Sequence, residues 1–291
     1  MSRYKYLPSS LAEALKIQGI SVRRPVHGFQ AGLHRSPHHG ASIEFAEYRA
    51  YSPGDPTNLI DWAVYARSDK YLIRQCYEET NLRAYVLLDI SGSLAFRDEG
   101  PVTKMEYGCS LAAGLMYMLV NQRDAVALMT FDMRLKQGFA PVSTSEGLRP
   151  MLEYLETIQP GGCGHIEAAL HEATTRMASK SLVIIISDFL QNAEMILRGI
   201  QHLHHDGHNI MVFHIMDRGE RRLSFSGIAE LRDLETKQKL VLDVDEIREA
   251  YQTAVALHQE TLRTACTNCL ASYHLIETNQ PVESILSKLG S

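Results

Sequence analysis

The chain has 291 residues, of which 45% are hydrophobic and 22% charged, and its net charge of −5 excludes the strongly basic surface of most nucleic-acid-binding proteins. Its five cysteines, an odd number in a long chain, argue against a disulfide framework. Because the start lacks a signal-peptide pattern and no apolar stretch approaches the roughly 20 residues that span a bilayer, we expect a cytoplasmic protein with no membrane span.

The first 82 residues show little regular pattern. Residues 9–19 predict a short helix, and the stretch 26–42, rich in Gly, His and Ser, predicts a loop. The stretch 43–83 is polar and irregular, and residues 70–77 within it predict a strand. We therefore expect residues 1–82 to form an N-terminal region distinct from the rest of the chain.

From residue 83 onward, apolar strands alternate with helical patterns. Near-continuous apolar runs are typical of strands that are buried on both faces of a sheet. The predicted strands cover residues 83–88, 125–131, 135–139, 182–186, 210–215 and 273–277, with a hairpin at 228–243. The predicted helices cover residues 104–121, 145–157, 166–178, 192–205, 245–271 and 282–289. This alternation predicts an α/β domain over residues 83–291, with a doubly wound, mostly parallel sheet and helices on both faces.

Two of the most apolar predicted strands end in an aspartate, Asp89 and Asp188. Ligands of doubly wound sheets bind at the carboxyl ends of the strands, so the two carboxylates meet if the strands are neighbours. Ser91 and Ser93 follow the first aspartate at alternate positions. Carboxylate and hydroxyl oxygens suit Mg²⁺ or Mn²⁺, and an open coordination position could accept an acidic side chain of a partner protein.

A simpler interpretation competes with a metal site. An aspartate at a strand end is often a turn residue or the N-cap of the next helix. We interpret Asp132 and Asp217, which also end apolar strands, in this way. The spacing of Asp89, Ser91 and Ser93 is a weak signal on its own, and Asp188 strengthens it.

These residues resemble a known family. Asp89-Ile90-Ser91-Gly92-Ser93 resembles the metal-ion-dependent adhesion site (MIDAS) of von Willebrand factor A (vWA) domains, and Ser187-Asp188 resembles its later aspartate segment. Further segments resemble the signature of the DUF58 family: Glu44-Phe45, Arg49-Ala50-Tyr51-Ser52-Pro53-Gly54-Asp55, Ile60-Asp61-Trp62, Ala66-Arg67, and the stretches 231–236 and 277–281.

The resemblance implies a vWA/Rossmann-like sheet with the Asp89 strand at its centre, the Asp188 strand beside it, and an N-terminal irregular or β segment packed on it. It also implies a cytoplasmic, non-enzymatic protein that binds its partners in a metal-dependent way. The expected partners are a MoxR-type AAA+ ATPase and its client, in the maturation or assembly of other proteins. The metal ligands carried over to this chain are Asp89, Ser91, Ser93 and Asp188.

The chain departs from the MIDAS pattern at one ligand. vWA domains usually supply a threonine from a later loop, whose counterpart here is Gly164, or Cys163 if the alignment shifts by one residue. Neither supplies a hydroxyl, so a metal-free, vestigial site is an alternative to a working one.

Charged and aromatic side chains are concentrated in the 44–67 segment. They fit either a docking surface for a partner or a set of contacts that fixes an irregular segment, with Trp62 packed underneath. We favour the structural interpretation for most of them. The residues concerned are Glu44, Arg49, Tyr51, Asp55, Asp61, Trp62 and Arg67.

A Mg²⁺-dependent phosphoester hydrolase is the competing function, with Asp89 as nucleophile. That chemistry expects a second carboxylate two residues later, where this chain has Ser91. It also expects a lysine near the strand ends, and Lys180 precedes its strand at the opposite edge. We therefore expect a binding protein and not an enzyme.

Overall fold

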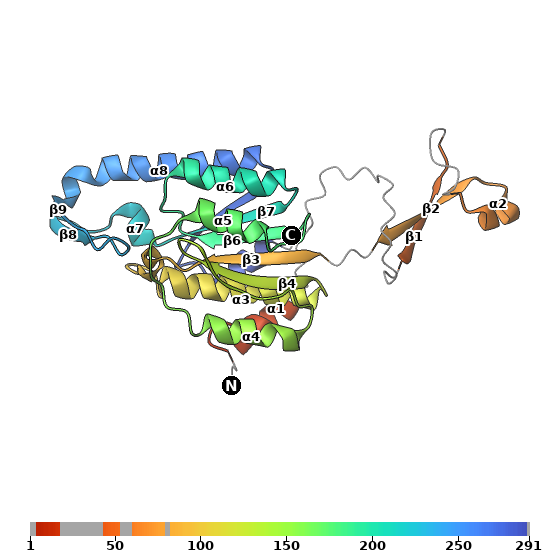
Figure 1. Cartoon of the computed structure of the whole chain (residues 1–291), viewed down its shortest axis with the longest axis horizontal. Coiled ribbons are helices and arrows are strands. Elements are labelled where there is room, and N and C mark those ends of the chain that lie inside the picture. Colours follow the sequence, from red (N-terminus) through yellow and green to blue (C-terminus); the bar gives the residue numbers. More distant parts are fainter. Residues whose placement is uncertain (1–3, 18–42, 53–59, 79–81, 290–291) are drawn as a thin grey trace. The chain divides into compact units, whose positions relative to one another are not determined.

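The computed structural model describes residues 4–17, 43–52, 60–78 and 82–289 (Figure 1). The predicted loop at 26–42 and Asp55 of the 44–67 segment lie outside these ranges. Contacts within the chain divide it into two compact units, Val26–Asn81 and the combination of Met1–Pro25 with Leu82–Ser291. We describe each unit by itself.

The smaller unit is a two-stranded antiparallel sheet with a short helix between its strands. Strand β1 (Ile43–Ala50) pairs with β2 (Leu72–Glu78), and helix α2 (Trp62–Ser68) lies between them in the sequence. The sequence pattern predicted β2 but neither β1 nor α2. A register shift between Phe45 and Glu47 interrupts the alternation of residue positions between the two faces of β1. Strand prediction depends on that alternation.

The larger unit is built on a six-stranded sheet of order β10-β7-β6-β3-β4-β5. Among the strands of this sheet β5 pairs antiparallel and the others pair parallel, which confirms the predicted mostly parallel sheet. The strands are β3 (Arg83–Asp89), β4 (Ala125–Phe131), β5 (Leu135–Gly138), β6 (Leu182–Ser187), β7 (Asn209–Met216) and β10 (Ser272–Glu277).

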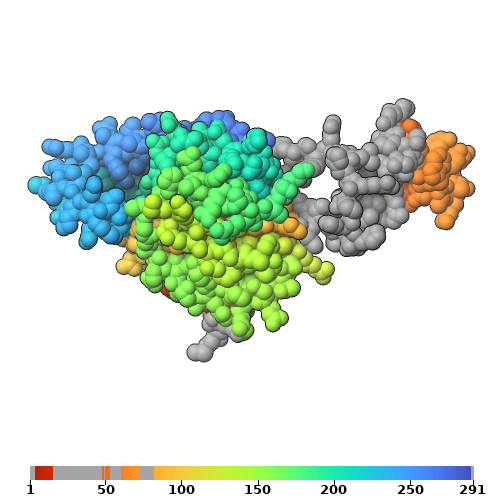
Figure 2. Space-filling view, in the orientation of Figure 1, coloured from red at the N-terminus to blue at the C-terminus, as the bar shows by residue number. Residues whose placement is uncertain are grey.

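Helices cover both faces of the sheet and create two separate cores. Val86 and Leu88 of β3 are buried in one core, and Tyr85 and Leu87 in the other, because successive strand residues point to opposite faces. The first core is closed by α1 (Ser9–Ile17), α3 (Lys104–Asn121), α4 (Ser145–Leu155) and α9 (Val282–Lys288). The second is closed by α5 (Ile166–Thr174), α6 (Ala193–His205) and α8 (Val244–Asn268). The helical side chains of this unit hide most of its sheet in the space-filling view (Figure 2).

Helix α1 belongs with the sheet although it precedes the smaller unit in the sequence. Its side chains Leu11 and Leu15 are buried in the same core as α3 and α9. The predicted N-terminal region of residues 1–82 is therefore divided between the two units, and its end coincides with the start of β3.

The remaining elements lie at or near the carboxyl ends of the parallel strands. They are the 3₁₀ turn η2 (Gly92–Ala95), helix α7 (Arg218–Arg222), and the predicted hairpin, formed by β8 (Ile228–Arg232) and β9 (Lys239–Asp243). Across the described ranges, no helix combines the length and the apolar character needed to cross a bilayer.

Candidate functional site

Asp89 and Asp188 lie at the ends of neighbouring strands, as the sequence predicted. Strands β3 and β6 pair in parallel with Leu88 beside Ile186, so Asp89 lies level with Ser187. One carboxylate oxygen of Asp89 accepts a hydrogen bond from the Ser91 amide (2.9 Å), and the other accepts one from the Ser187 hydroxyl (2.6 Å). Asp89 is only 1% exposed, so these two contacts fix the orientation of a buried carboxylate.

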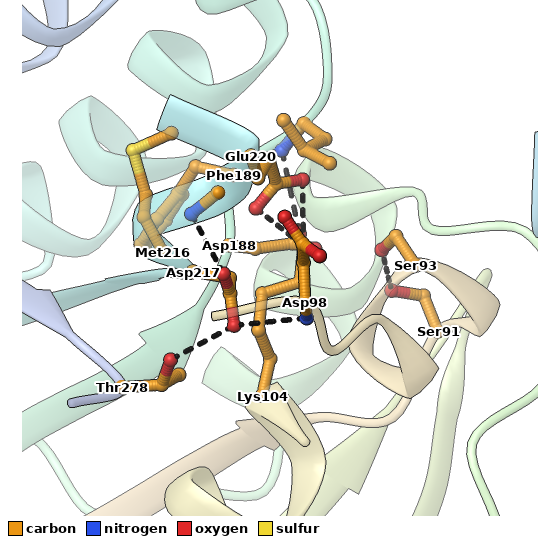
Figure 3. A network of polar contacts seen from close by, with 12 residues as sticks. Ser91, Ser93, Asp98, Lys104, Asp188, Phe189, Met216, Asp217, Glu220 and Thr278 are labelled. Atoms are coloured by element: carbon orange, nitrogen blue, oxygen red, sulfur yellow. Dashed lines mark hydrogen bonds and ion pairs between the residues drawn. The ribbon is translucent and has the colours of Figure 1, made fainter. Parts of the chain in front are cut away.

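The hydroxyls of Ser91 and Ser93 point toward each other at the start of η2. Their Oγ atoms are 3.1 Å apart (Figure 3). Neighbouring ligands of an octahedral Mg²⁺ ion, each about 2.1 Å from the metal, are separated by roughly 3.0 Å. The two hydroxyls therefore have the spacing of adjacent ligands of one small cation.

A fully buried lysine, Lys104, is the largest departure from the predicted site. Its Nζ donates to Asp188 at 2.7 Å and to both carboxylate oxygens of Glu220 at 2.9 and 3.0 Å (Figure 3). The Lys104 side chain is 0% exposed, compared with 3% for Asp188 and 12% for Glu220. Burial lowers the pKa of Lys104, but the two carboxylates outweigh it and raise that pKa above its ordinary value. We call Lys104, Asp188 and Glu220 the lysine cluster.

The buried charges around Asp89 do not balance. Lys104 pairs with the carboxylates of Asp188 and Glu220, and the Asp89 carboxylate lies near Asp188, so the group holds three carboxylates and one ammonium. Burial and the nearby Asp188 carboxylate raise the pKa of Asp89 to about 7. In the described residues, no three Asp, Glu, His or Cys side chains are grouped closely enough to hold a metal by themselves. The donors that fit a cation are two carboxylates and two hydroxyls: Asp89, Ser91, Ser93 and Asp188, which we call the candidate cation site.

The position of the missing threonine is filled by another side chain. A Cβ atom built on Gly164 would lie 3.5 Å from Cβ of Ser91, so this glycine does border the candidate cation site. The same Cβ would lie 2.3 Å from Nε2 of Gln191, whose Oε1 accepts a hydrogen bond from the Ile166 amide at 2.9 Å. Cys163 is exposed. Gln191 therefore occupies the space in which a threonine side chain would begin.

We expect Gly164→Ala to lower the free energy of unfolding by about 1 kcal/mol, because the added methyl must displace the Gln191 amide from its hydrogen bond. Gly161→Ala is the matched control, since its Cβ would meet no atom within 4 Å. Urea unfolding of both variants measures the difference. Equal stability of the two would show that Gln191 does not hold this position.

Asp132 and Asp217 have the structural roles that the sequence suggested. Asp217 caps α7 through the Gly219 amide (2.8 Å) and also accepts hydrogen bonds from the amides of Asp98, Glu99 and Gly100 and from the Thr278 hydroxyl. Asp132 pairs with Lys136 at 3.0 Å. Both carboxylates are therefore occupied in fixing loops at the sheet edge.

The 44–67 segment belongs to the smaller unit, whereas Asp89 belongs to the larger one. Asp61 is the N-cap of α2, where its Oδ1 accepts from the amides of Ala63 and Val64 at 3.0 and 3.1 Å. Trp62 is 56% exposed, which differs from the buried packing that we expected for it. Glu44 and Arg49 lie in β1, Tyr51 follows that strand, and Arg67 lies in the last turn of α2. The docking of a partner by this segment stays the alternative prediction to its structural role.

Sequence reasoning missed Lys104, Glu220 and Gln191, and it named Ser187 only as part of the Ser187-Asp188 segment. One local signal pointed to Lys104: it is the first residue of α3, directly after the N-cap Thr103. A cation in the first helical turn opposes the helix dipole, so a lysine there needs a specific anionic partner. No local pattern identified Asp188 and Glu220 as those partners, because they are distant in the sequence.

The sheet order, the helices on both faces and the Asp89 loop define a vWA-like α/β protein. The family model described as "Protein of unknown function DUF58" matches residues 47–261, and the chain belongs to this family. Uncharacterized proteins of Mycobacterium bovis and Mycobacterium tuberculosis are 23% identical over 276 residues, which cover 93% of this chain and 86% of theirs.

Solved structures with a similar fold include vWA domains. BatB of Bacteroides thetaiotaomicron is 16% identical, covering 72% of this chain and 96% of its own, with a TM-score of 0.47. The vWA domain of SpRpn10 is 12% identical, covering 71% and 94%, with a TM-score of 0.43. An aerotolerance-related membrane protein of Bacteroides fragilis is 18% identical, covering 72% and 96%, with a TM-score of 0.49.

The prediction of a cytoplasmic location is corrected by these comparisons. A chain with a similar fold, that of Bacteroides fragilis, is described as a membrane protein. We assign no location to the chain.

Proposed function

We propose that this protein is a non-enzymatic, metal-dependent protein-binding module that acts with a MoxR-type AAA+ ATPase in the maturation or assembly of other proteins. A vWA-like fold in a DUF58 protein is typical of a protein-interaction module. The metal dependence and the choice of partner go further than that, and they are the parts to be tested.

The excess of buried negative charge beside two paired hydroxyls is the observation that carries the metal dependence. Lys104 neutralises part of the charge of Asp188 and Glu220, and a divalent cation bound to Asp89, Ser91 and Ser93 would neutralise the charge that remains in the group. Asp188 is held by Lys104, so it would contribute from a greater distance or through a water molecule. A cation bound in this way keeps coordination positions for an acidic side chain of the partner.

Lys104 bears on the hydrolase alternative. It lies at the strand ends, where a lysine that binds phosphate would be needed, and the sequence had offered only Lys180 for that purpose. Its side chain is wholly buried, however, and its ammonium donates to two carboxylates. The Lys104 ammonium is therefore not accessible to a phosphate group. This supports the binding function over the hydrolase.

Binding of a purified MoxR-type ATPase should depend on the cation. We expect the immobilised protein to retain the ATPase in buffer that contains Mg²⁺ and to release it on addition of a chelator. Asp89→Asn should behave like the chelated protein. Retention that is unaffected by both treatments would contradict the proposed metal dependence, and turnover of p-nitrophenyl phosphate lost in Asp89→Asn would favour the hydrolase.

A further inference from the structure

The turn between β8 and β9 lies directly on the loop that carries Ser91 and Ser93. A Cβ atom on Gly92 would be only 2.9 Å from the carbonyl oxygen of Leu234 and 3.2 Å from that of Gly162. A backbone can approach this closely only where residue 92 has no side chain. The hairpin turn, residues 233–236, is therefore packed against the candidate cation site.

Glu235 of this turn reaches the position where the usual threonine ligand is missing. Its Oε2 accepts a hydrogen bond from the Gly164 amide at 3.1 Å, and Gly164 in turn borders Ser91. Among the residues that the structure describes, the other carboxylate oxygen of Glu235 accepts no hydrogen bond, so it is available to a water molecule on a bound cation.

Contacts within the turn hold Glu235 in place. The Asp233 carboxylate accepts hydrogen bonds from the Glu235 amide (2.8 Å) and from the Thr236 hydroxyl. The Lys237 ammonium donates to the Leu234 carbonyl. The backbone of Glu235 is thus fixed before any ligand binds, which reduces the entropy lost when its carboxylate is used.

We propose that Glu235 takes over the role of the missing threonine, so that the hairpin turn forms one side of the candidate cation site and the Glu235 carboxylate binds a water molecule on the cation. This inference rests on the proposed metal dependence. It also explains how the site can function with Gly164 in place of a hydroxyl. A carboxylate adds a negative charge that a threonine lacks, and this charge attracts a divalent cation.

The test is titration of Mn²⁺ alone into metal-stripped full-length protein by calorimetry. We expect Glu235→Gln to weaken Mn²⁺ binding at least about tenfold, the range seen for residues that orient or assist metal ligands. Glu230→Gln is the matched control, because it removes an equal charge from the same hairpin, where Glu230 pairs with Lys239 at 2.7 Å. Glu230→Gln should leave the affinity within about twofold of the unmodified chain.

The outcomes separate this inference from the proposed function. If the unmodified chain binds Mn²⁺, Asp89→Asn does not, and Glu235→Gln binds as tightly as the unmodified chain, the role of Glu235 is wrong while the metal dependence stands. If the unmodified chain binds no Mn²⁺, both are wrong. If Glu230→Gln weakens binding as much as Glu235→Gln, the effect is the general charge of the hairpin, and the specific role of Glu235 is overturned.

Discussion

Replacing Lys104 with methionine is expected to lower the free energy of unfolding of the larger unit by about 3–5 kcal/mol. The substitution leaves Asp188 and Glu220, which are 3% and 12% exposed, without their common cation. Removing one partner of a buried ion pair is costly because the remaining charge can neither return to water nor find another partner. Methionine keeps the length and apolar packing of the lysine side chain, so the loss in the free energy of unfolding measures the effect of removing the charge.

The measurement must follow the larger unit. Trp62, the only tryptophan of the chain, lies in the smaller unit, so unfolding should be monitored by far-UV circular dichroism and not by tryptophan fluorescence. Lys239→Met is the control, since Lys239 and its partner Glu230 are 55% and 51% exposed, and ion pairs at the surface contribute about 0–1 kcal/mol. Adding Glu220→Gln to Lys104→Met should recover part of the loss. Equal stability of Lys104→Met and Lys239→Met would contradict the role of the lysine cluster.

Replacing Asp89 with asparagine is expected to weaken Mn²⁺ binding by roughly 100-fold or more, since the change removes the charge of the central ligand. Asparagine has the shape of aspartate. Its side-chain oxygen can accept a hydrogen bond from the Ser91 amide, and its NH₂ group can donate one to the Ser187 hydroxyl. The cation-free protein should therefore remain folded. The same variant removes one of the three buried carboxylates, so it should not be less stable than the unmodified chain without metal.

Proton competition gives this prediction a second readout. Because the pKa of Asp89 is about 7 without a cation, a proton occupies the carboxylate increasingly as the pH falls below 7. Mn²⁺ affinity of the unmodified chain should fall by up to about tenfold per pH unit below that value. Asp132→Asn, at the end of the neighbouring strand β4, is the control and should retain both the affinity and its pH dependence. No saturable binding in the unmodified chain would establish the vestigial site.

The sequence located the candidate cation site because its donors follow strand ends, and strand ends can be predicted. Asp89 and Asp188 each follow a run of apolar residues, and the carboxyl ends of neighbouring parallel strands necessarily meet. The alternation of apolar strands with amphipathic helices likewise predicted the sheet and the bounds of α3. In the smaller unit the sequence pattern did not predict β1, because a register shift interrupts the alternation of its residues.

The tertiary structure alone decided which charges surround Asp188 and which side chains approach Gly164. Lys104 and Glu220 come from two different helices, and Glu235 comes from a hairpin turn, so their approach to the site depends on loop paths that no local pattern encodes. The apolar pattern determined the fold because burial acts on every strand and helix at once. The polar contacts of the site depend on single side chains that meet only after the sheet and its covering helices have formed.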